Sequence, residues 1–315
     1  MRGLFFSYLN VGGYTMANKT KQRMSLRGSW FLGLIRPIAW IVFLLPIMGG
    51  FYLGATKDTP LSSILFGFGS LIFVLCFGFT VNALSDIDVD KYHDGRSKDM
   101  VLSRQPLVTG KISVRQANLF CLLFLAGSIL CSLMLGLSFI ILILLLDGIA
   151  YVYSHEPFRL KKRPVGDIIA NALLAEFFFL AGITIGNGSW NPLLIIIVFL
   201  LAANFYIPTV MTDYEFDKKA GLRTSAVIFG GQRLVTAMYF LTAASCLIGL
   251  ILIVSSSVEV QITAVMMIMY TPLLTIMTKQ RLHGNQLLLH QNWMLVPFAS
   301  LTLVFLCLGF LRVIS

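Results

Sequence analysis

Charged residues are scarce in this sequence. Asp, Glu, Lys and Arg together make up 12% of the 315 residues, whereas 57% of the residues are hydrophobic. Soluble globular domains carry about 25% charged residues, so this chain has too little charge to cover a water-facing globule of its size. The shortage argues against a soluble enzyme, a disordered chain and a coiled coil, and it predicts a membrane protein.

Paired cysteines and several catalytic signatures are missing as well. No GxxxxGK phosphate loop, GxSxG serine elbow or HExxH zinc motif occurs. The apolar–polar alternation over about ten residues that is typical of a membrane β-barrel is also absent. Without CxxC spacing, the cysteines are interpreted as small buried apolar residues inside apolar blocks; they are Cys76, Cys121, Cys131, Cys246 and Cys307.

Long apolar blocks are what the sequence has instead. Blocks of about 20 residues can cross a bilayer as helices. The gap between the third and fourth blocks is very short, so we expect a tight turn at Gly136. We predict an all-α polytopic membrane bundle of nine transmembrane helices, near residues 33–56, 61–84, 115–136, 138–154, 167–186, 192–212, 233–254, 258–278 and 292–314.

The basic residues sort to one side of this arrangement. Of the 24 Lys and Arg residues, 22 fall in the N-terminal segment or in the loops after the even-numbered helices, and only Lys57 and Arg312 fall on the other side. Since cytoplasmic loops collect Lys and Arg, we predict a cytoplasmic N-terminus and a C-terminus outside. The net charge of +10 is then explained mostly by the membrane topology, and no nucleic-acid partner is expected.

This orientation divides the chain into two parts. A polar, basic cytoplasmic segment covers residues 1–29, and a single transmembrane domain covers residues 30–315. Within the domain, we expect three cytoplasmic loops to carry the chemistry, at 84–114, 153–167 and 212–232.

Acidic residues gather in two short patches on the predicted cytoplasmic side, which together hold eight of the 14 Asp and Glu residues. In the first patch, Asn82, Asp86, Asp90 and Asp94 are spaced by four, so they form one stripe if the second helix continues that far. Like charges at this spacing repel each other, and a cation among them would offset that cost. Mg²⁺ prefers oxygen ligands and usually takes one or two carboxylates plus substrate phosphates.

The second patch repeats the pattern at the end of the sixth helix, with Asp213 and Asp217. Solvated helix ends are the structural alternative. Two such acid pairs in equivalent topological positions, in so acid-poor a chain, favour facing carboxylate sets that hold Mg²⁺ on a diphosphate. A calcium loop of the EF-hand type is excluded because its glycine and terminal glutamate are not at the required positions.

Polar residues near the patches have two interpretations. Most of the bases are explained by topology alone, but a subset could bind phosphate oxygens. Loop 153–167 is the best candidate after the acid patches, because its prolines fix its turns. Asp147 and Glu176, at membrane depth, either line a cavity or pair with hydroxyls, and Asn204 lies in the sixth helix.

At these residues the sequence resembles the UbiA superfamily of intramembrane prenyltransferases. Its first motif is similar to Asn82-Ala-Leu-Ser-Asp86-Ile-Asp-Val-Asp90. Its second motif is similar to Asp213-Tyr-Glu-Phe-Asp217, and its loop after the fourth helix is similar to the segment 153–161. The resemblance runs from about residue 33 to the end of the chain. One departure is Ala83, which stands where the family has Asp, so one metal ligand is missing and Asp88 or Asp94 is the candidate replacement.

The resemblance implies Mg²⁺-dependent transfer of a polyprenyl group from an allylic polyprenyl diphosphate to a lipophilic acceptor. Catalytic roles are implied for Asp86, Asp90, Asp213, Asp217 and Lys161, with the four aspartates as metal ligands and Asp88 and Asp94 as further candidates. The residues implied in diphosphate binding are Asn82, Arg104, Tyr153, Arg159, Asn171, Lys218 and Arg223.

The acceptor class stays open at this point. It is an aromatic or quinone precursor, a tetrapyrrole or a glyceryl phosphate, and the form of loop 153–167 is more like the family branches that act on the last two. The alternative is a transporter or an assembly protein with a divalent-cation or phosphate site. We expect an integral, multi-pass protein of the cell membrane, surrounded by lipid and with its active site on the cytoplasmic side.

Overall fold

The computed structural model of the chain describes residues 29–90, 105–283 and 292–314. Within these ranges every regular element is helical, which confirms the predicted all-α fold class. The elements are α2 (Ser29–Ile35), η1 (Pro37–Trp40), α3 (Ile41–Gly54), α4 (Leu61–Ser85), α5 (Ile87–Asp90), α6 (Val114–Ser132), η3 (Leu133–Leu135), α7 (Leu137–Ser154), η4 (Leu160–Lys162), α8 (Gly166–Ile185), α9 (Pro192–Thr212), α10 (Tyr214–Lys219), α11 (Ser225–Ser255), α12 (Val258–His283) and α13 (Asn292–Ile314).

Eight helical stretches in the described part of the chain are long and apolar enough to cross a membrane. The first of them, Trp30–Gly54, joins α2, η1 and α3. The last helix, α13, has a shorter described apolar part, Ala299–Ile314. The chain is thus an integral, multi-pass membrane protein, while the count of nine spans stays a prediction. Gly136 has φ +89° between η3 and α7, as expected for a tight turn.

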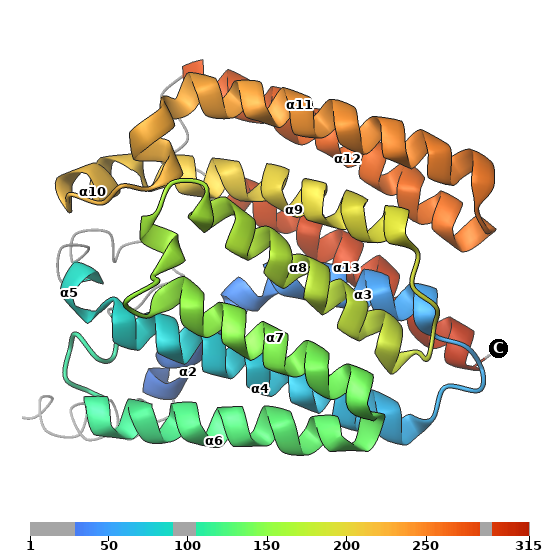
Figure 1. The fold of residues 1–315 in the computed structure, drawn as a ribbon, viewed down its shortest axis with the longest axis horizontal. Coiled ribbons are helices and arrows are strands. Elements are labelled where there is room, and N and C mark those ends of the chain that lie inside the picture. The colour runs from blue at the N-terminus through green and yellow to red at the C-terminus, as the bar shows by residue number, and fades with distance from the viewer. Residues whose placement is uncertain (1–28, 91–104, 284–291, 315) are drawn as a thin grey trace, which may run out of the picture.

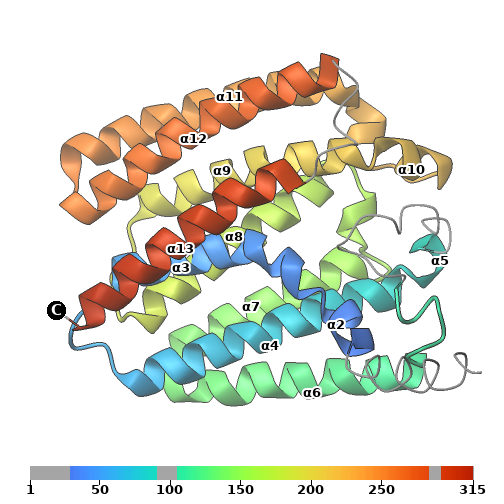
Figure 2. The same cartoon turned by 180° about the vertical axis from the view of Figure 1, so that it is seen from behind.

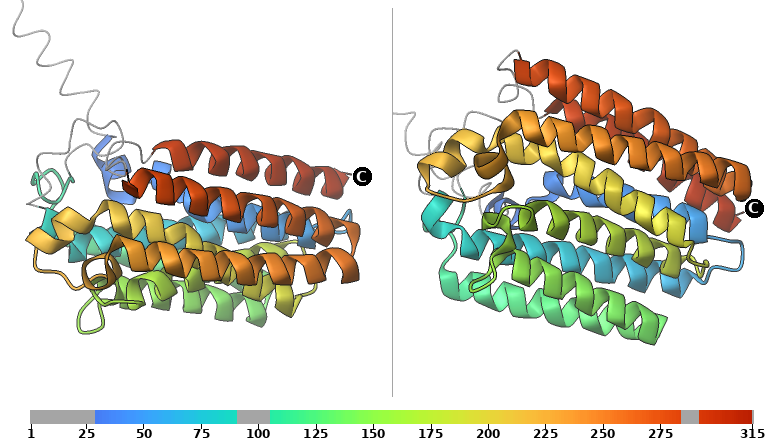
Figure 3. Two further views of the ribbon diagram at one scale, coloured as in Figure 1. Left: turned by 90° about the horizontal axis from the view of Figure 1, so that it is seen from above. Right: turned by 45° about the horizontal axis from the view of Figure 1, so that its top comes forward.

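The helices lie side by side as an elongated bundle (Figure 1). In that view α8 lies between α7 and α9, with α11 and α12 beyond α9 and with α4 and α6 on the opposite side. Seen from behind, α13 lies against α3 (Figure 2). The short helices α5 and α10 lie at one end of the bundle, and the C-terminus lies at the other (Figures 1 and 3).

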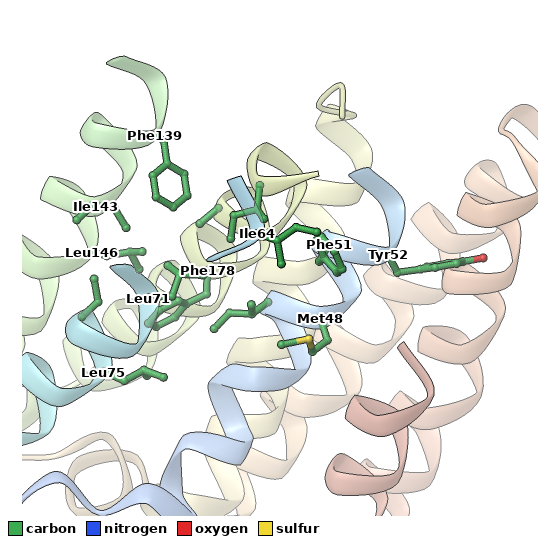
Figure 4. Close-up of a cluster of buried hydrophobic side chains, with 14 of the residues drawn as sticks. Met48, Phe51, Tyr52, Ile64, Leu71, Leu75, Phe139, Ile143, Leu146 and Phe178 are labelled. Carbon is green, nitrogen blue, oxygen red and sulfur yellow. The ribbon is translucent and has the colours of Figure 1, made fainter. Parts of the chain in front are cut away.

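The largest apolar cluster joins α3, α4, α7 and α8. Figure 4 shows Phe51, Leu71, Phe139 and Phe178 from these four helices pointing toward one another. Each of these side chains is at most 2% exposed. Burial of large apolar residues from four helices fixes the positions of those helices relative to one another.

Close contact between α3 and α8 depends on glycine. A Cβ atom added at Gly50 would lie 2.0 Å from the Phe179 carbonyl oxygen, and one added at Gly182 would lie 2.2 Å from the Ile47 carbonyl oxygen. Small residues allow this approach of two backbones, which is a principal way in which helices associate within lipid. The seam between α3 and α8 therefore has no room for side chains at these two positions.

Two expectations are corrected by the structure. Helix α11 begins at Ser225, but Gly230 interrupts its helical backbone with φ +74°, a conformation that glycine adopts at little cost, so the uninterrupted helix starts close to the predicted residue 233. The predicted loop 212–232 therefore holds α10 and the first eight residues of α11, including the break at Gly230. The cysteines are free, but only Cys76 is buried and Cys307 is exposed, because several apolar positions of a membrane helix face outward.

We expect Gly50→Ala to destabilise the protein by about 3 kcal/mol, because the new methyl group must force α3 and α8 apart. Gly148→Ala is the matched control, since a Cβ atom at Gly148 meets nothing within 4 Å. Thermal unfolding in detergent compares the two variants with the wild-type protein. Equal midpoints for both variants would show that the seam tolerates a side chain.

Candidate functional site

Both acid patches begin where a membrane helix ends. Asp86 follows α4 with φ −105° and ψ 6°, and Asp213 follows α9 with φ −91° and ψ −2°. One turn further, Asp90 N donates to Asp86 O at 2.8 Å and Asp217 N donates to Asp213 O at 2.9 Å. The two patches therefore share one local design, in which a bent helix end continues as α5 or α10. The predicted stripe through the first patch is bent at Asp86 and not straight.

Loop 153–167 brings its basic residues onto the first patch. Lys161 Nζ lies 2.7 Å from Asn82 Oδ1 and 2.7 Å from Asp86 Oδ1. Arg159 Nη2 lies 3.2 Å from the same Asp86 oxygen and donates to the Ser85 carbonyl. Arg159 has φ 38°, in the left-handed region, where it begins the short turn η4. The structure thus gathers three predicted site residues around Asp86.

Burial sets the electrostatics of this cluster. Desolvation lowers the pKa of Lys161, and the neighbouring Asp86 charge opposes that shift. Burial raises the pKa of Asp90 from 3.8 to about 6, against the effect of Arg36, whose Nη2 lies 3.6 Å from Asp90 Oδ2. Asp86 is therefore closely paired with cations, whereas the charge of Asp90 is less well compensated.

A buried carboxylate connects loop 153–167 to the second patch. Asp167 is 1% exposed and accepts a hydrogen bond from Ser225 N at 2.8 Å. Ser225 Oγ accepts from Val165 N at 2.7 Å, and the adjacent Thr224 donates to Asp217 Oδ2 at 2.9 Å. These contacts fix the end of the loop against the start of α11, next to the second acid pair.

The carboxylates match Mg²⁺ in donor chemistry but do not form one metal-binding group. Among the residues that the structure describes, no three His, Cys, Asp or Glu side chains lie close enough together to hold a metal ion. Both patches do lie at the same end of the bundle (Figure 1). Oxygen donors are what Mg²⁺ prefers, and a cation at Asp90 would offset the desolvation of that carboxylate. The residues present therefore fit the predicted ion.

An apolar cavity opens beside the charged cluster. Its empty space, counted together with the open space at its mouth, is about 970 Å³, and it is lined by residues of α3, α8, α9, α12 and α13. Asn171 and Tyr206 are at its end nearest the acid patches, and Tyr206 hydrogen-bonds to Tyr153 at 2.7 Å between the hydroxyl oxygens. The next residue, Ser154, donates to Asn82 Oδ1 at 3.3 Å. Two consecutive residues thus contact the cavity lining and the charged cluster.

The remaining predicted site residues are placed less centrally. Lys218 is exposed on α10 with its Nζ 5.5 Å from the Tyr214 ring centre, and Arg223 is exposed in the turn before α11. Asp88 is exposed on α5. Asp94 and Arg104 lie outside the described residues.

Ala83 faces away from the carboxylates. It is 0% exposed and belongs to an apolar cluster with Leu34 and Leu107. A carboxylate at this position would be buried among apolar groups without compensation. In this structure the departure from the family motif therefore removes no side chain from the acid cluster.

The polar groups at membrane depth are paired within the bundle. Asp147 Oδ2 accepts from Ser128 Oγ at 2.7 Å, and Asn204 Nδ2 donates to Thr242 Oγ1 at 3.0 Å. Of the two alternatives for Asp147, pairing with a hydroxyl is confirmed. Glu176 is half-buried, and neither acid is among the residues that line the cavity.

Tyr206 is a site residue that sequence reasoning missed. It precedes Asp213 by seven residues on α9, so the two lie about two turns apart on one face of the helix. The seven-residue spacing from Asp213 could therefore have pointed to Tyr206 from the sequence. Asp167 and Ser225 were missed as partners because their contact joins segments far apart in the chain.

Comparisons with known proteins identify the family. Residues 43–294 match the model of the UbiA prenyltransferase family. A UbiA homolog from Archaeoglobus fulgidus, solved bound to DMAPP and Mg²⁺, has 41% identity and a TM-score of 0.85, covering 90% of this chain and 98% of that one.

Curated relatives point in the same direction. A digeranylgeranylglyceryl phosphate synthase of Methanococcus aeolicus is 24% identical over 69% of this chain and 75% of its own length. A 4-hydroxybenzoate octaprenyltransferase of Francisella tularensis is 25% identical over 63% of this chain and 68% of its own length.

The raised pKa of Asp90 predicts a pH-dependent effect of Asp90→Asn. The unfolded state ionises near its pKa of 3.8, whereas the folded state holds the Asp90 proton up to about pH 6, so the wild-type protein loses stability as the pH rises from 3.8 to about 6. Asn cannot ionise. In EDTA, the variant should therefore gain about 2 kcal/mol relative to wild type between about pH 4 and pH 8. Thermal unfolding across this range tests the expectation, and a constant difference would contradict it.

Proposed function

Because the chain belongs to the UbiA prenyltransferase family and is a prenyltransferase, we propose that it transfers a polyprenyl group from an allylic diphosphate to a lipophilic acceptor within the membrane. One observation carries this proposal. The cationic cluster at Lys161 and the apolar cavity meet at Tyr153 and Ser154, so one site offers a charged place for a diphosphate next to a dry place for an isoprenoid chain.

In this reaction the allylic C–O bond breaks with its electron pair leaving on diphosphate oxygen. Lys161 and Arg159 supply positive charge where that negative charge develops, and Asn82 orients Lys161. Asp86, Asp90, Asp213 and Asp217 are the residues that would hold Mg²⁺. When bound, the ion supplies further neutralisation of the diphosphate.

The cavity keeps water from the reacting carbon. Its walls are largely aliphatic and aromatic, with Asn171 and Tyr206 as the polar groups near the charged cluster. An allylic cation lasts long enough to meet its acceptor only where water is excluded. The acceptor then forms the new bond to the prenyl carbon and loses a proton.

The acceptor is proposed by class. One curated relative is named for a glyceryl phosphate and another for hydroxybenzoate. The form of loop 153–167 favours a glyceryl phosphate or a tetrapyrrole as the acceptor over a hydroxybenzoate. A transporter would place its charged site near the bilayer midplane. Both acid patches here lie at helix ends, which supports the enzyme.

We propose that the site faces the cytoplasm of a cell membrane. The acid pairs Asp86/Asp90 and Asp213/Asp217, and most of the basic residues that the structure describes, lie in segments at the end of the bundle away from the C-terminus (Figure 1). Cytoplasmic segments collect Lys and Arg.

We expect Asp86→Asn and Asp213→Asn each to lower prenyl transfer at least about 100-fold, because each removes a charge from the proposed metal–diphosphate site. The assay combines purified protein, a labelled polyprenyl diphosphate, Mg²⁺ and acceptors of the three classes. Asp58→Asn, an exposed acid in the turn between α3 and α4, is the control and should keep wild-type activity. Turnover by Asp86→Asn or Asp213→Asn at the wild-type rate would remove that aspartate from the metal site.

The orientation predicts opposite outcomes for two reporter fusions in a bacterial host. Alkaline phosphatase needs disulfides and folds only outside the cytoplasm, so a fusion at the C-terminus should be active. A fusion placed after Lys219 should be inactive, because α10 is proposed to be cytoplasmic. The reverse pair of activities would invert the topology.

A further inference from the structure

The cavity extends along α8 away from Asn171 and reaches an aromatic wall about two helical turns further on. Gly49 of α3, Phe179 of α8 and Phe305 of α13 line it there. A Cβ atom added at Gly49 would lie 3.9 Å from Phe179 Cε2 and 4.0 Å from Phe305 Cδ2, which are ordinary van der Waals distances. The two aromatic rings therefore lie opposite Gly49, and the space between them and the glycine could hold a methyl group. We call these three residues the floor.

The floor is held rigidly from behind. Phe179 is 1% exposed and Phe305 is 5% exposed. The Phe305 ring packs on Tyr52 at 5.7 Å, and the Tyr52 carbonyl accepts a hydrogen bond from Arg312 at 3.1 Å. The Phe179 backbone is in direct contact with Gly50 across the α3–α8 seam. Movement of either ring would disturb this helix packing, so the floor bounds the cavity on this side.

The depth of the cavity has the scale of a short isoprenoid. Asn171 at the polar end and Phe179 in the floor lie about two turns apart on α8, or about 12 Å at 1.5 Å per residue. An extended chain advances about 1.2 Å per covalent bond, so an isoprene unit with four bonds along the chain covers about 5 Å. An extended chain of two to three isoprene units reaches from Asn171 to the floor, and a longer chain must bend or leave through the open side.

We propose that Gly49, Phe179 and Phe305 determine the length of prenyl chain that the enzyme accepts. The inference rests on the proposed function, since it takes the cavity as the place of the prenyl chain. Gly49 is the most sensitive position, because any side chain there projects into the cavity and raises the floor. The neighbouring Gly50 cannot serve this purpose, because its Cβ position is taken by the backbone of α8.

The test measures binding, so it needs no acceptor. Full-length protein in lipid nanodiscs is titrated calorimetrically with the S-thiolodiphosphate analogues of geranyl, farnesyl and geranylgeranyl diphosphate in the presence of Mg²⁺. The readout is the ratio of the dissociation constants for the longest and the shortest analogue. A general loss of folded protein lowers the number of sites and leaves this ratio unchanged.

Gly49→Leu should raise that ratio about tenfold or more, because mismatches of methylene size change discrimination by about tenfold to 200-fold. Phe305→Ala, which lowers the floor, should reduce the ratio. Gly148→Leu adds the same side chain on the exposed face of α7 and should leave the ratio as in wild type. Unchanged ratios in both floor variants, with all analogues still binding, would overturn the proposal and leave the proposed function intact. Failure of every analogue to bind the wild-type protein would overturn the proposed function itself.

Discussion

Lys161, at the edge of a membrane protein, carries its charge on a side chain that is only 10% exposed, and the other groups of the site lie around that charge. A charged amine held away from water is stable only beside compensating groups. Asn82 and Asp86 provide them from the end of α4, each within 2.7 Å of the amine. This contact holds loop 153–167 against the first acid patch. Through Asp167 and Ser225, the end of the same loop is fixed to α11 beside the second patch.

Hydropathy and spacing were enough to predict the helical architecture and the location of both acid patches. Apolar length determines where a helix can cross a bilayer, and acids at intervals of four stand out in a chain with so few charges. The same patterns could not show that Ala83 points into an apolar cluster, because which face of a helix meets which neighbour depends on tertiary packing. For the same reason, hydropathy could not show which helices surround the cavity.

The predicted start of α11 after its first residues also has a physical cause. Gly230, Gly231 and Gln232 interrupt the apolar pattern, so hydropathy placed the start of the span after them. Thr224 and Ser225 nevertheless bind Asp217 and Asp167 and fix the start of the helix by tertiary hydrogen bonds. Local propensity is overridden there by contacts with segments distant in sequence.

Gly49 and Gly50 are neighbours in sequence but meet different surroundings, because successive residues of a helix point about 100° apart. Gly50 sets how closely α3 approaches α8, and Gly49 sets how much of the space beyond stays empty. Stability and substrate range are thereby assigned to separate positions only one residue apart. A lineage of such enzymes could change the length of prenyl chain that it accepts by single substitutions at Gly49. Gly50, and with it the packing of the bundle, would stay constant. Evolvability of this kind is a direct product of helical geometry.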